Sequence, residues 1–216
     1  MEEKKIFISG SGGQGVLLFG KILATASMLD GKNVTWIPSY GAEMRGGIVD
    51  CAVTVSREDI GSPLVKEPNI LIAMNNLALE KYCHKVVAGG LVLANRSLTD
   101  SLPHFFRRDV EILSLPAVEM AKAASGHTKL ANMVMLGVLC YKTKVVSREK
   151  IEESIYSLVA HHDKEFISLN LNALHTGIEY IKRQLYQDTT NNKHIEGHTY
   201  QGRNMSREKV VDDHTA

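Results

Sequence analysis

Six residues near the amino terminus, Gly10-Ser11-Gly12-Gly13-Gln14-Gly15, have the types and spacing of an anion-binding turn. Three of the glycines match the pattern G-x-G-x-x-G, which lets a backbone turn tightly and approach a ligand closely. If this turn opens a helix, the first amide groups of that helix have no partner within it and suit a phosphate or a carboxylate. The alternative is a tight strand-to-helix turn that binds nothing. The cofactor-binding residues expected here are Gly10, Gly12, Gly13, Gln14 and Gly15.

The segments that flank this turn have the pattern of a strand followed by a helix. Ile6-Phe7-Ile8 is a short apolar run, and the residues from Val16 onward have a helical apolar pattern. A dinucleotide site also needs an Asp or Glu about 20 residues further on, at the end of the second strand. Asp30 precedes the expected second strand, and Glu43 follows the break at Pro38. The sequence therefore favours a general anion or phosphate site over NAD or FAD.

A second segment that can do chemistry is Pro38–Gly47, which follows the expected second strand. Arg45 can bind a carboxylate or a phosphate through two hydrogen bonds, and we expect it to bind the anionic cofactor. One alternative is an internal Glu43–Arg45 pair that stiffens the loop, and another is a contact with a partner subunit. The residues expected to shape the loop or to contact a partner are Ser39, Tyr40, Gly41, Glu43, Gly46 and Gly47.

Two asparagines complete the candidate site. Asn75 follows the apolar run 69–74, so in a parallel sheet it lies at the same edge as the glycine turn. It can contact a ligand there or cap the helix that follows. Asn132 lies in an almost wholly apolar helical stretch and must find a hydrogen bond. Its partner is either a structural group, or a ligand or a neighbouring subunit.

The remaining elements predict an α/β fold with three layers (α/β/α), a mainly parallel sheet, a Rossmann-like glycine turn and C-terminal helices. The expected strands are 4–9, 33–37, 48–55, 69–74, 91–95 and 110–115, and the expected helices are 16–29, 77–82, 117–124, 130–141, 148–159 and 164–185. Residues 187–216 are polar with few large apolar side chains, so we expect a folded domain over 1–186 and a flexible polar tail over 187–216.

Composition limits the classes of partner and cofactor. With 25 Lys and Arg against 24 Asp and Glu, broad electrostatic binding to nucleic acid or to a membrane is not indicated. The three cysteines are far apart, so the chain has no iron–sulfur or zinc signature. Neither a signal-peptide core nor a membrane-spanning stretch is evident, which predicts a cytoplasmic location. We find no pattern for catalytic or metal-ligating residues, which is typical of a subunit of a larger enzyme.

Taken together, the motifs resemble the gamma subunit of 2-oxoacid:ferredoxin oxidoreductases, over about residues 4 to 185. The resemblance is carried in order by Gly10–Leu18, Trp36–Gly47, Gly61-Ser62-Pro63, Asn69–Asn75, Gly89–Val92, Asn132 with Leu136-Gly137, and Asn172-Ala173 with Gly177. It implies a thiamine-diphosphate enzyme that oxidatively decarboxylates a 2-oxoacid to an acyl-CoA and passes electrons to ferredoxin. The segment Glu43–Gly47 most resembles the 2-oxoglutarate branch.

The resemblance also implies what other chains supply. Thiamine diphosphate, Mg and the iron–sulfur clusters belong to alpha, beta and delta-type subunits, and CoA is the substrate whose phosphates the glycine turn and Arg45 are expected to bind. Two alternatives remain: a stand-alone dinucleotide-binding oxidoreductase, and a non-catalytic assembly subunit.

Overall fold

The computed structural model describes residues 3–40, 47–98, 107–159 and 164–201, with only the backbone of Tyr40 and of residues 188–201. Its strands are β1 (Lys4–Ser11), β2 (Asn33–Tyr40), β3 (Ile48–Ser56), β4 (Ile70–Ala73), β5 (Leu91–Asn95) and β6 (Glu111–Leu115). Its α-helices are α1 (Val16–Leu29), α2 (Asn76–Tyr82), α3 (Ala117–Ser125), α4 (Ala131–Thr143), α5 (Arg148–Leu158) and α6 (Lys164–Gln201). Short 3₁₀ helices are η1 (Cys83–Lys85), η2 (Arg96–Leu98) and η3 (Thr128–Leu130).

These strands form one sheet in the order β2-β3-β1-β4-β5-β6. Strands β1, β4, β5 and β6 are parallel, whereas β3 runs antiparallel to both β1 and β2. The mainly parallel α/β fold predicted from the sequence is confirmed. One feature departs from a dinucleotide-binding fold: β3 lies between β1 and β2, so the strand after α1 is not the neighbour of the strand before it.

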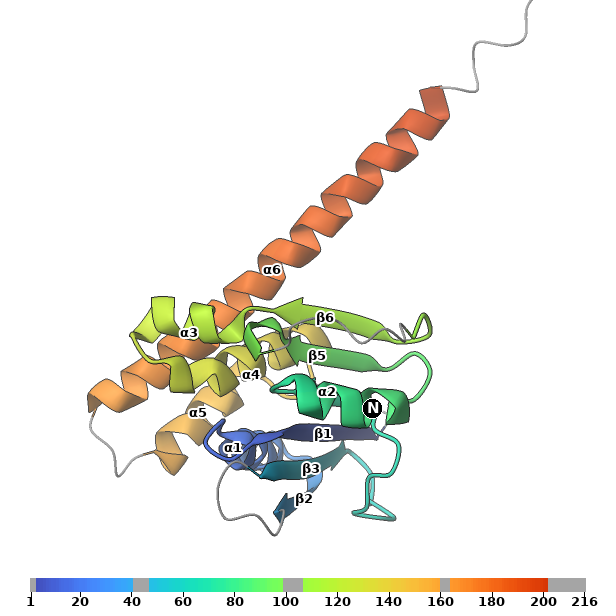
Figure 1. Ribbon diagram of the computed structural model, residues 1–216. Helices are drawn as coiled ribbons and strands as arrows, with labels where there is room; N and C mark the ends of the chain where they lie inside the picture. Colours follow the sequence, from blue (N-terminus) through green and yellow to red (C-terminus); the bar gives the residue numbers. More distant parts are fainter. Residues whose placement is uncertain (1–2, 41–46, 99–106, 160–163, 202–216) are drawn as a thin grey trace, which may run out of the picture.

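Helices cover both faces of the sheet (Figure 1). On one face, Ile6 and Ile8 of β1 and Val53 of β3 pack with α1 and α3–α6 in the main core. On the other face, α2 and η1 cover Leu71 and Val92 in a smaller core. Strands β4 and β5 are buried on both faces, which explains their unbroken apolar runs.

Helix α4 is the most deeply buried helix segment of the main core. Residues 131–140 are all buried, as its apolar character on every side predicts. It crosses α6 so closely that a Cβ atom on Gly137 would lie 2.1 Å from the Leu174 carbonyl oxygen. A Cβ on Gly177 would lie 2.0 Å from the Val134 carbonyl oxygen. Both positions therefore require glycine for the two helices to meet.

Helix α6 continues well past the point at which the sequence becomes polar. Its backbone is helical from Lys164 to Gln201, and its carboxyl-terminal half projects away from the sheet (Figure 1). The segment predicted as a flexible tail, 187–216, thus begins inside a helix. Since helix formation adds one hydrogen bond per residue once a helix exists, α6 can extend without packing partners.

Candidate functional site

The glycine turn joins β1 to α1 at the carboxyl edge of the parallel strands, where ligands bind in open α/β sheets. Gly13 and Gly15 have positive φ angles of 91° and 72°, which glycine adopts without strain. Gly10 admits close packing, because a Cβ there would lie 2.5 Å from Gln14 Oε1 and 2.8 Å from Met74 Cβ. The G-x-G-x-x-G pattern thus has a conformational reason at its last glycine and a steric reason at its first.

Gln14 holds the turn in shape. Its Oε1 accepts hydrogen bonds from the Ser11 amide at 2.6 Å and from Asn75 Nδ2 at 3.0 Å. Its Nε2 donates to the Met74 carbonyl oxygen at 3.2 Å. The Gln14 side chain, which we expected to bind the anion, therefore forms hydrogen bonds that link the end of β1 to the residues after β4.

Asn75 performs the capping role that the sequence left open. Its Oδ1 accepts from the Ala78 amide at 2.9 Å and so caps α2, while its Nδ2 also donates to Ser11 Oγ at 2.9 Å. Asn75 lies at the same sheet edge as the glycine turn, as predicted, and links that turn to α2. The question of ligand contact stays a prediction.

Asn132 lies beneath the turn and is 3% exposed. Its Nδ2 donates to the Gly15 carbonyl oxygen at 3.3 Å, and its Oδ1 accepts from the Met133 amide at 3.0 Å. A Cβ on Gly15 would lie 2.2 Å from Asn132 Nδ2. Both polar atoms of the amide group thus have structural partners, and the asparagine supports the glycine turn from the start of α4.

Asn95 is a member of this edge that the sequence analysis did not identify. It is fully buried at the end of β5, where its Nδ2 donates to the Met74 carbonyl oxygen at 3.2 Å. Its Oδ1 accepts from the amides of Ser97 and Ala117. A polar residue at the end of the apolar run 91–94 was the available signal, the same signal that identified Asn75.

The two motifs predicted to act together meet at this edge. The Gly12 amide donates to the Gly47 carbonyl oxygen at 3.2 Å, and Ser11 pairs with Ile48 in the sheet. The segment 38–47 therefore ends beside the glycine turn at Gly47, whereas residues 38–40 lie on the edge strand β2 and pair with β3. Ser39 is exposed on the edge strand β2. The predicted site residues that lie outside the described residues are Gly41, Glu43, Arg45 and Gly46, and the side chain of Tyr40 lies outside them too.

Two of the backbone amides expected to bind an anion already have acceptors within the chain. Gly12 donates to Gly47 as above, and Gln14 donates to the Ser11 carbonyl oxygen at 3.1 Å. Over the described residues, no hydrogen bond is found from the amides of Gly13 and Gly15, and α1 has no side-chain cap. These two amides and the first turn of α1 are the donors that remain for a ligand.

A cavity of about 250 Å³ lies beside Gly13. Gly13, Gln14, Asn95 and Lys129 are among its lining residues. Lys129 is exposed, and within the described part of the chain it has no ion-pair partner. This cation was not identified from the sequence, because η3 brings it to the turn from more than 100 residues away. A cavity with one free cation and free amides can bind a phosphate or a carboxylate.

An acidic group stabilises the start of β3 near the same edge. Asp50 accepts a hydrogen bond from the buried Ser9 hydroxyl at 2.6 Å and another from the Tyr82 hydroxyl. Burial, together with the hydrogen bond to Asp50 and its charge, raises the pKa of Tyr82 above its ordinary value. Tyr82 therefore remains a protonated donor, and its hydrogen bond to Asp50 connects α2 to β3, the strand that follows the Arg45 segment (residues 38–47).

The cysteines of the chain are buried and lie apart from one another. Cys51, Cys83 and Cys140 are all buried, and burial raises the pKa of each thiol. No group of three or more His, Cys, Asp and Glu side chains is placed to hold a metal in these parts of the chain. None of the described helices is both long enough and apolar enough to cross a membrane.

Comparison with known proteins identifies the family. Residues 5–180 match the family model described as pyruvate ferredoxin/flavodoxin oxidoreductase. The 2-oxoglutarate synthase subunit KorC of Methanocaldococcus jannaschii is 37% identical over 182 residues, which cover 83% of this chain and 94% of KorC. The ketoisovalerate oxidoreductase subunit VorA of Methanothermobacter thermautotrophicus is 36% identical over 184 residues. That match covers 85% of this chain but only 37% of VorA.

A solved structure agrees with these matches. The gamma subunit of a keto/oxoacid ferredoxin oxidoreductase from Geobacter sulfurreducens superposes with a TM-score of 0.70 and 30% identity. The superposition covers 83% of this chain and 99% of that subunit. Since the family model and relatives above 30% identity cover most of the sequence, this chain belongs to the pyruvate ferredoxin/flavodoxin oxidoreductase family.

Proposed function

We propose that this chain is the gamma subunit of a 2-oxoacid:ferredoxin oxidoreductase that uses 2-oxoglutarate. The complete enzyme would oxidatively decarboxylate the 2-oxoacid to an acyl-CoA and reduce ferredoxin. The match to KorC, which covers nearly all of that subunit, supports this assignment. VorA is about as similar, but the matched region is a minor part of a longer protein, so the proposal favours 2-oxoglutarate over ketoisovalerate.

The role proposed for this chain is to bind the phosphates of CoA. The observation that carries it is the hydrogen bond from the Gly12 amide to the Gly47 carbonyl, because it brings the end of the Arg45 segment to the glycine turn. Gly13, whose amide makes no hydrogen bond within the described residues, and the cation Lys129 line the same cavity, and Gly15 lies two residues further along the turn. Several donors around one anion bind that anion more strongly than a single donor does. Each hydrogen bond to the charged group is also about twice as strong as a hydrogen bond between neutral groups.

The chemistry of the acyl transfer would take place on other subunits. In the proposal, thiamine diphosphate, Mg and the iron–sulfur clusters belong to alpha, beta and delta-type partners, and ferredoxin contacts the complex. This is consistent with cysteines that are buried and separate, and with the described residues offering no group of three metal ligands. The residues present therefore fit an anionic substrate better than they fit a metal cluster.

The sheet topology argues against the alternative of a stand-alone dinucleotide enzyme. In a dinucleotide-binding fold, the acidic residue that binds the ribose ends the strand beside β1. Here the neighbour of β1 on that side is the antiparallel β3, which starts rather than ends at the carboxyl edge. Strand β2 itself, Asn33–Tyr40, contains no acidic residue. A flat calorimetric titration of the purified chain with NADH and with FAD is expected.

The complex tests the proposal directly. The chain is reconstituted with its partner subunits, and ferredoxin reduction is measured with 2-oxoglutarate, pyruvate and branched-chain 2-oxoacids. We expect turnover only in the complex, and the highest kcat/KM with 2-oxoglutarate. Copurification of partners with no 2-oxoacid activity in any assay would instead identify an assembly subunit.

Two substitutions test the CoA-binding role. Arg45→Ala and Lys129→Ala should each raise the KM for CoA by about tenfold or more, since a charged hydrogen bond is worth roughly 1.5–3 kcal/mol. Lys66→Ala is the matched control, because Lys66 is exposed and lies just before β4, at the other end of the sheet. If Arg45→Ala changes neither the KM for CoA nor complex assembly, the role given to Arg45 is wrong. Hydrogen exchange at residues 12–15 should slow when CoA is added to the complex.

A further inference from the structure

A second cavity, of about 540 Å³, lies at the end of the sheet opposite to the glycine turn. It is lined by the turn that precedes β2, by Arg57 after β3, and by the connection from α4 to α5. Because β2 runs parallel to β1 and β3 runs antiparallel, these segments meet at the amino edge of the parallel strands. This cavity is therefore separate from the proposed CoA-binding edge, and its volume is in the range of small-molecule sites.

A partly buried ion pair between Lys32 and Asp30 lines one side of this cavity. The side chain of Lys32 is only 6% exposed, and its Nζ donates to Asp30 Oδ2 at 2.7 Å and to the Val145 carbonyl oxygen at 2.6 Å. Ser147 Oγ donates to the other carboxylate oxygen of Asp30 at 3.2 Å. Burial opposes ionisation of Asp30, but Lys32 and Ser147 outweigh it and lower the pKa of that carboxyl. The charges of Lys32 and Asp30 thus offset each other.

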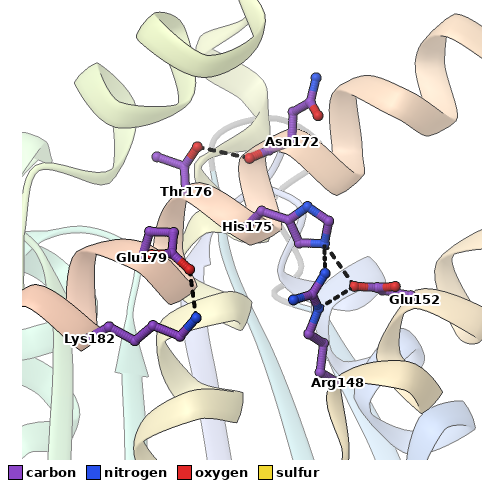
Figure 2. Close-up of polar contacts among 7 residues, drawn as sticks. All are labelled: Arg148, Glu152, Asn172, His175, Thr176, Glu179 and Lys182. Carbon is purple, nitrogen blue, oxygen red and sulfur yellow. Dashed lines mark hydrogen bonds and ion pairs between the residues drawn. The ribbon is translucent and has the colours of Figure 1, made fainter.

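One wall consists of cations on α5 and α6 that already have partners (Figure 2). Arg148 pairs with Glu152 at 2.5 Å and lies 3.1 Å from His175 Nε2. Lys182 pairs with Glu179 at 2.6 Å, and its Nζ lies 5.6 Å from the centre of the Tyr141 ring. These pairs hold the wall in place, and their charges largely cancel.

Two cations of this cavity have no counter-charge among the residues that the structure describes. Arg57 and Lys144 are both exposed, and over the described residues neither has an ion-pair partner. Lys144 extends from the end of α4, where it adopts the left-handed conformation with φ 51°. The first-turn amides of α5 add partial positive charge to the same wall. Since Glu152 and Glu179 offset Arg148 and Lys182, and Asp30 offsets Lys32, the two remaining cations favour an anion with about two negative charges.

An apolar surface lies beside these charges. Val146, Ile178 and Cys140 are buried residues that line the cavity, and the half-exposed Tyr141 ring joins them. A site of this kind has room for an apolar or aromatic group as well as a phosphate. An inorganic anion would contact only the charged part of it.

We infer that this amino-edge cavity binds a phosphorylated small molecule of nucleotide size, with the phosphates on Arg57 and Lys144 and the apolar or aromatic group on Val146, Ile178 and Tyr141. The site is distinct from the CoA-binding edge, and it does not depend on the function proposed above.

Calorimetric titration of the full chain with ADP tests this inference, with pyrophosphate and adenosine as partial probes. ADP should bind saturably, and it should bind about tenfold or more tightly than either partial probe. Arg57→Glu and Lys144→Glu should each weaken ADP binding by about tenfold or more. Val146→Trp should abolish binding by filling the cavity, with circular dichroism confirming that this variant is folded. Lys66→Glu, a charge reversal at an exposed lysine outside the cavity, should leave binding unchanged.

Each contrary result has a specific meaning. Absence of saturable ADP binding would overturn the inference. So would Arg57→Glu and Lys144→Glu variants that bind ADP as tightly as the unsubstituted chain does. Pyrophosphate binding as tightly as ADP would refute the role of the apolar surface, and adenosine binding as tightly would refute the role of the cations. Loss of ADP binding in Lys129→Glu but not in Lys144→Glu would place the ligand at the other edge of the sheet.

Discussion

Gly15 and Asn132 form the most constrained contact at the candidate site, so substitution of Gly15 gives the sharpest test of the structure. Gly15→Ala introduces two separate penalties. The new residue must adopt a φ angle of 72°, and its Cβ would lie 2.2 Å from Asn132 Nδ2 and 2.8 Å from Asn132 Cγ. Gly13→Ala is the matched control, because Gly13 has a φ angle of 91° but nothing within 4 Å of its Cβ position.

The size of each penalty can be worked from this geometry. An alanine in the left-handed region costs about 1–2 kcal/mol, which is the whole effect expected for Gly13→Ala. The overlap with Asn132 adds about 1–3 kcal/mol for Gly15→Ala, since the buried asparagine must either be compressed or give up its two hydrogen bonds. Gly15→Ala should therefore lower the free energy of unfolding by about 2–5 kcal/mol.

A double-mutant cycle isolates the overlap. Asn132→Ala alone removes two hydrogen bonds and should cost about 2 kcal/mol. In the double variant of Gly15 and Asn132 the overlap no longer exists, so its loss of stability should fall short of the sum of the single losses by about 1–3 kcal/mol. Urea denaturation of the purified chain, followed by circular dichroism, measures all four free energies of unfolding.

The structural account of the turn would be refuted by either of two results. One is a Gly15→Ala variant no less stable than Gly13→Ala, which would mean that the two residues do not meet. The other is strict additivity in the cycle, which would mean that Asn132 does not respond to the new methyl group.

Three further predictions follow from other parts of the molecule. Gly137→Ala should destabilise the chain by about 2 kcal/mol or more, because the new Cβ atom separates α4 from α6. Gly61→Ala should change the unfolding temperature little, since no atom lies within 4 Å of the Cβ position of Gly61. Equal effects of the two substitutions would contradict the helix contact. Burial opposes ionisation of Glu152, but hydrogen bonds from Arg148 and His175 outweigh it and lower the pKa of Glu152 below 4.5. The ionised Glu152 therefore stabilises the fold above pH 4.5, and this stabilisation is lost as the pH falls through the lower pKa of the folded state. Glu152→Gln should therefore lose less stability than the unsubstituted chain between about pH 5 and about pH 3 in thermal unfolding, and parallel curves would contradict this. Burial raises the pKa of the Cys51 and Cys140 thiols to about 12. These thiols should therefore not react with a chromogenic disulfide reagent at about pH 8 until the chain unfolds, and rapid labelling of the folded chain would disprove their burial.

Local sequence determined the elements and the main parts of the edge. The glycine spacing after Ile8 predicted the turn, and the apolar runs at 69–74 and 91–95 predicted two central strands, which the structure confirms. These features depend on neighbours within a few residues, so pattern and propensity are sufficient. Ser147 shows the limit of such reasoning: a serine before a helix is a typical N-cap, but the Ser147 hydroxyl donates to Asp30 and makes no capping hydrogen bond to α5.

Only the tertiary structure decided which distant residues meet. The insertion of β3 between β1 and β2 depends on strand pairing across the chain, and so does the bond from Gly12 to Gly47. Asn132 reaches Gly15 across 117 residues, and η3, which directly precedes α4, brings Lys129 to the cavity beside the turn. No local pattern encodes such contacts, because they result from the common burial of apolar faces on one core. The sequence by itself determined that a glycine turn joins β1 to α1, and the packing of α4 and β3 decided what surrounds that turn.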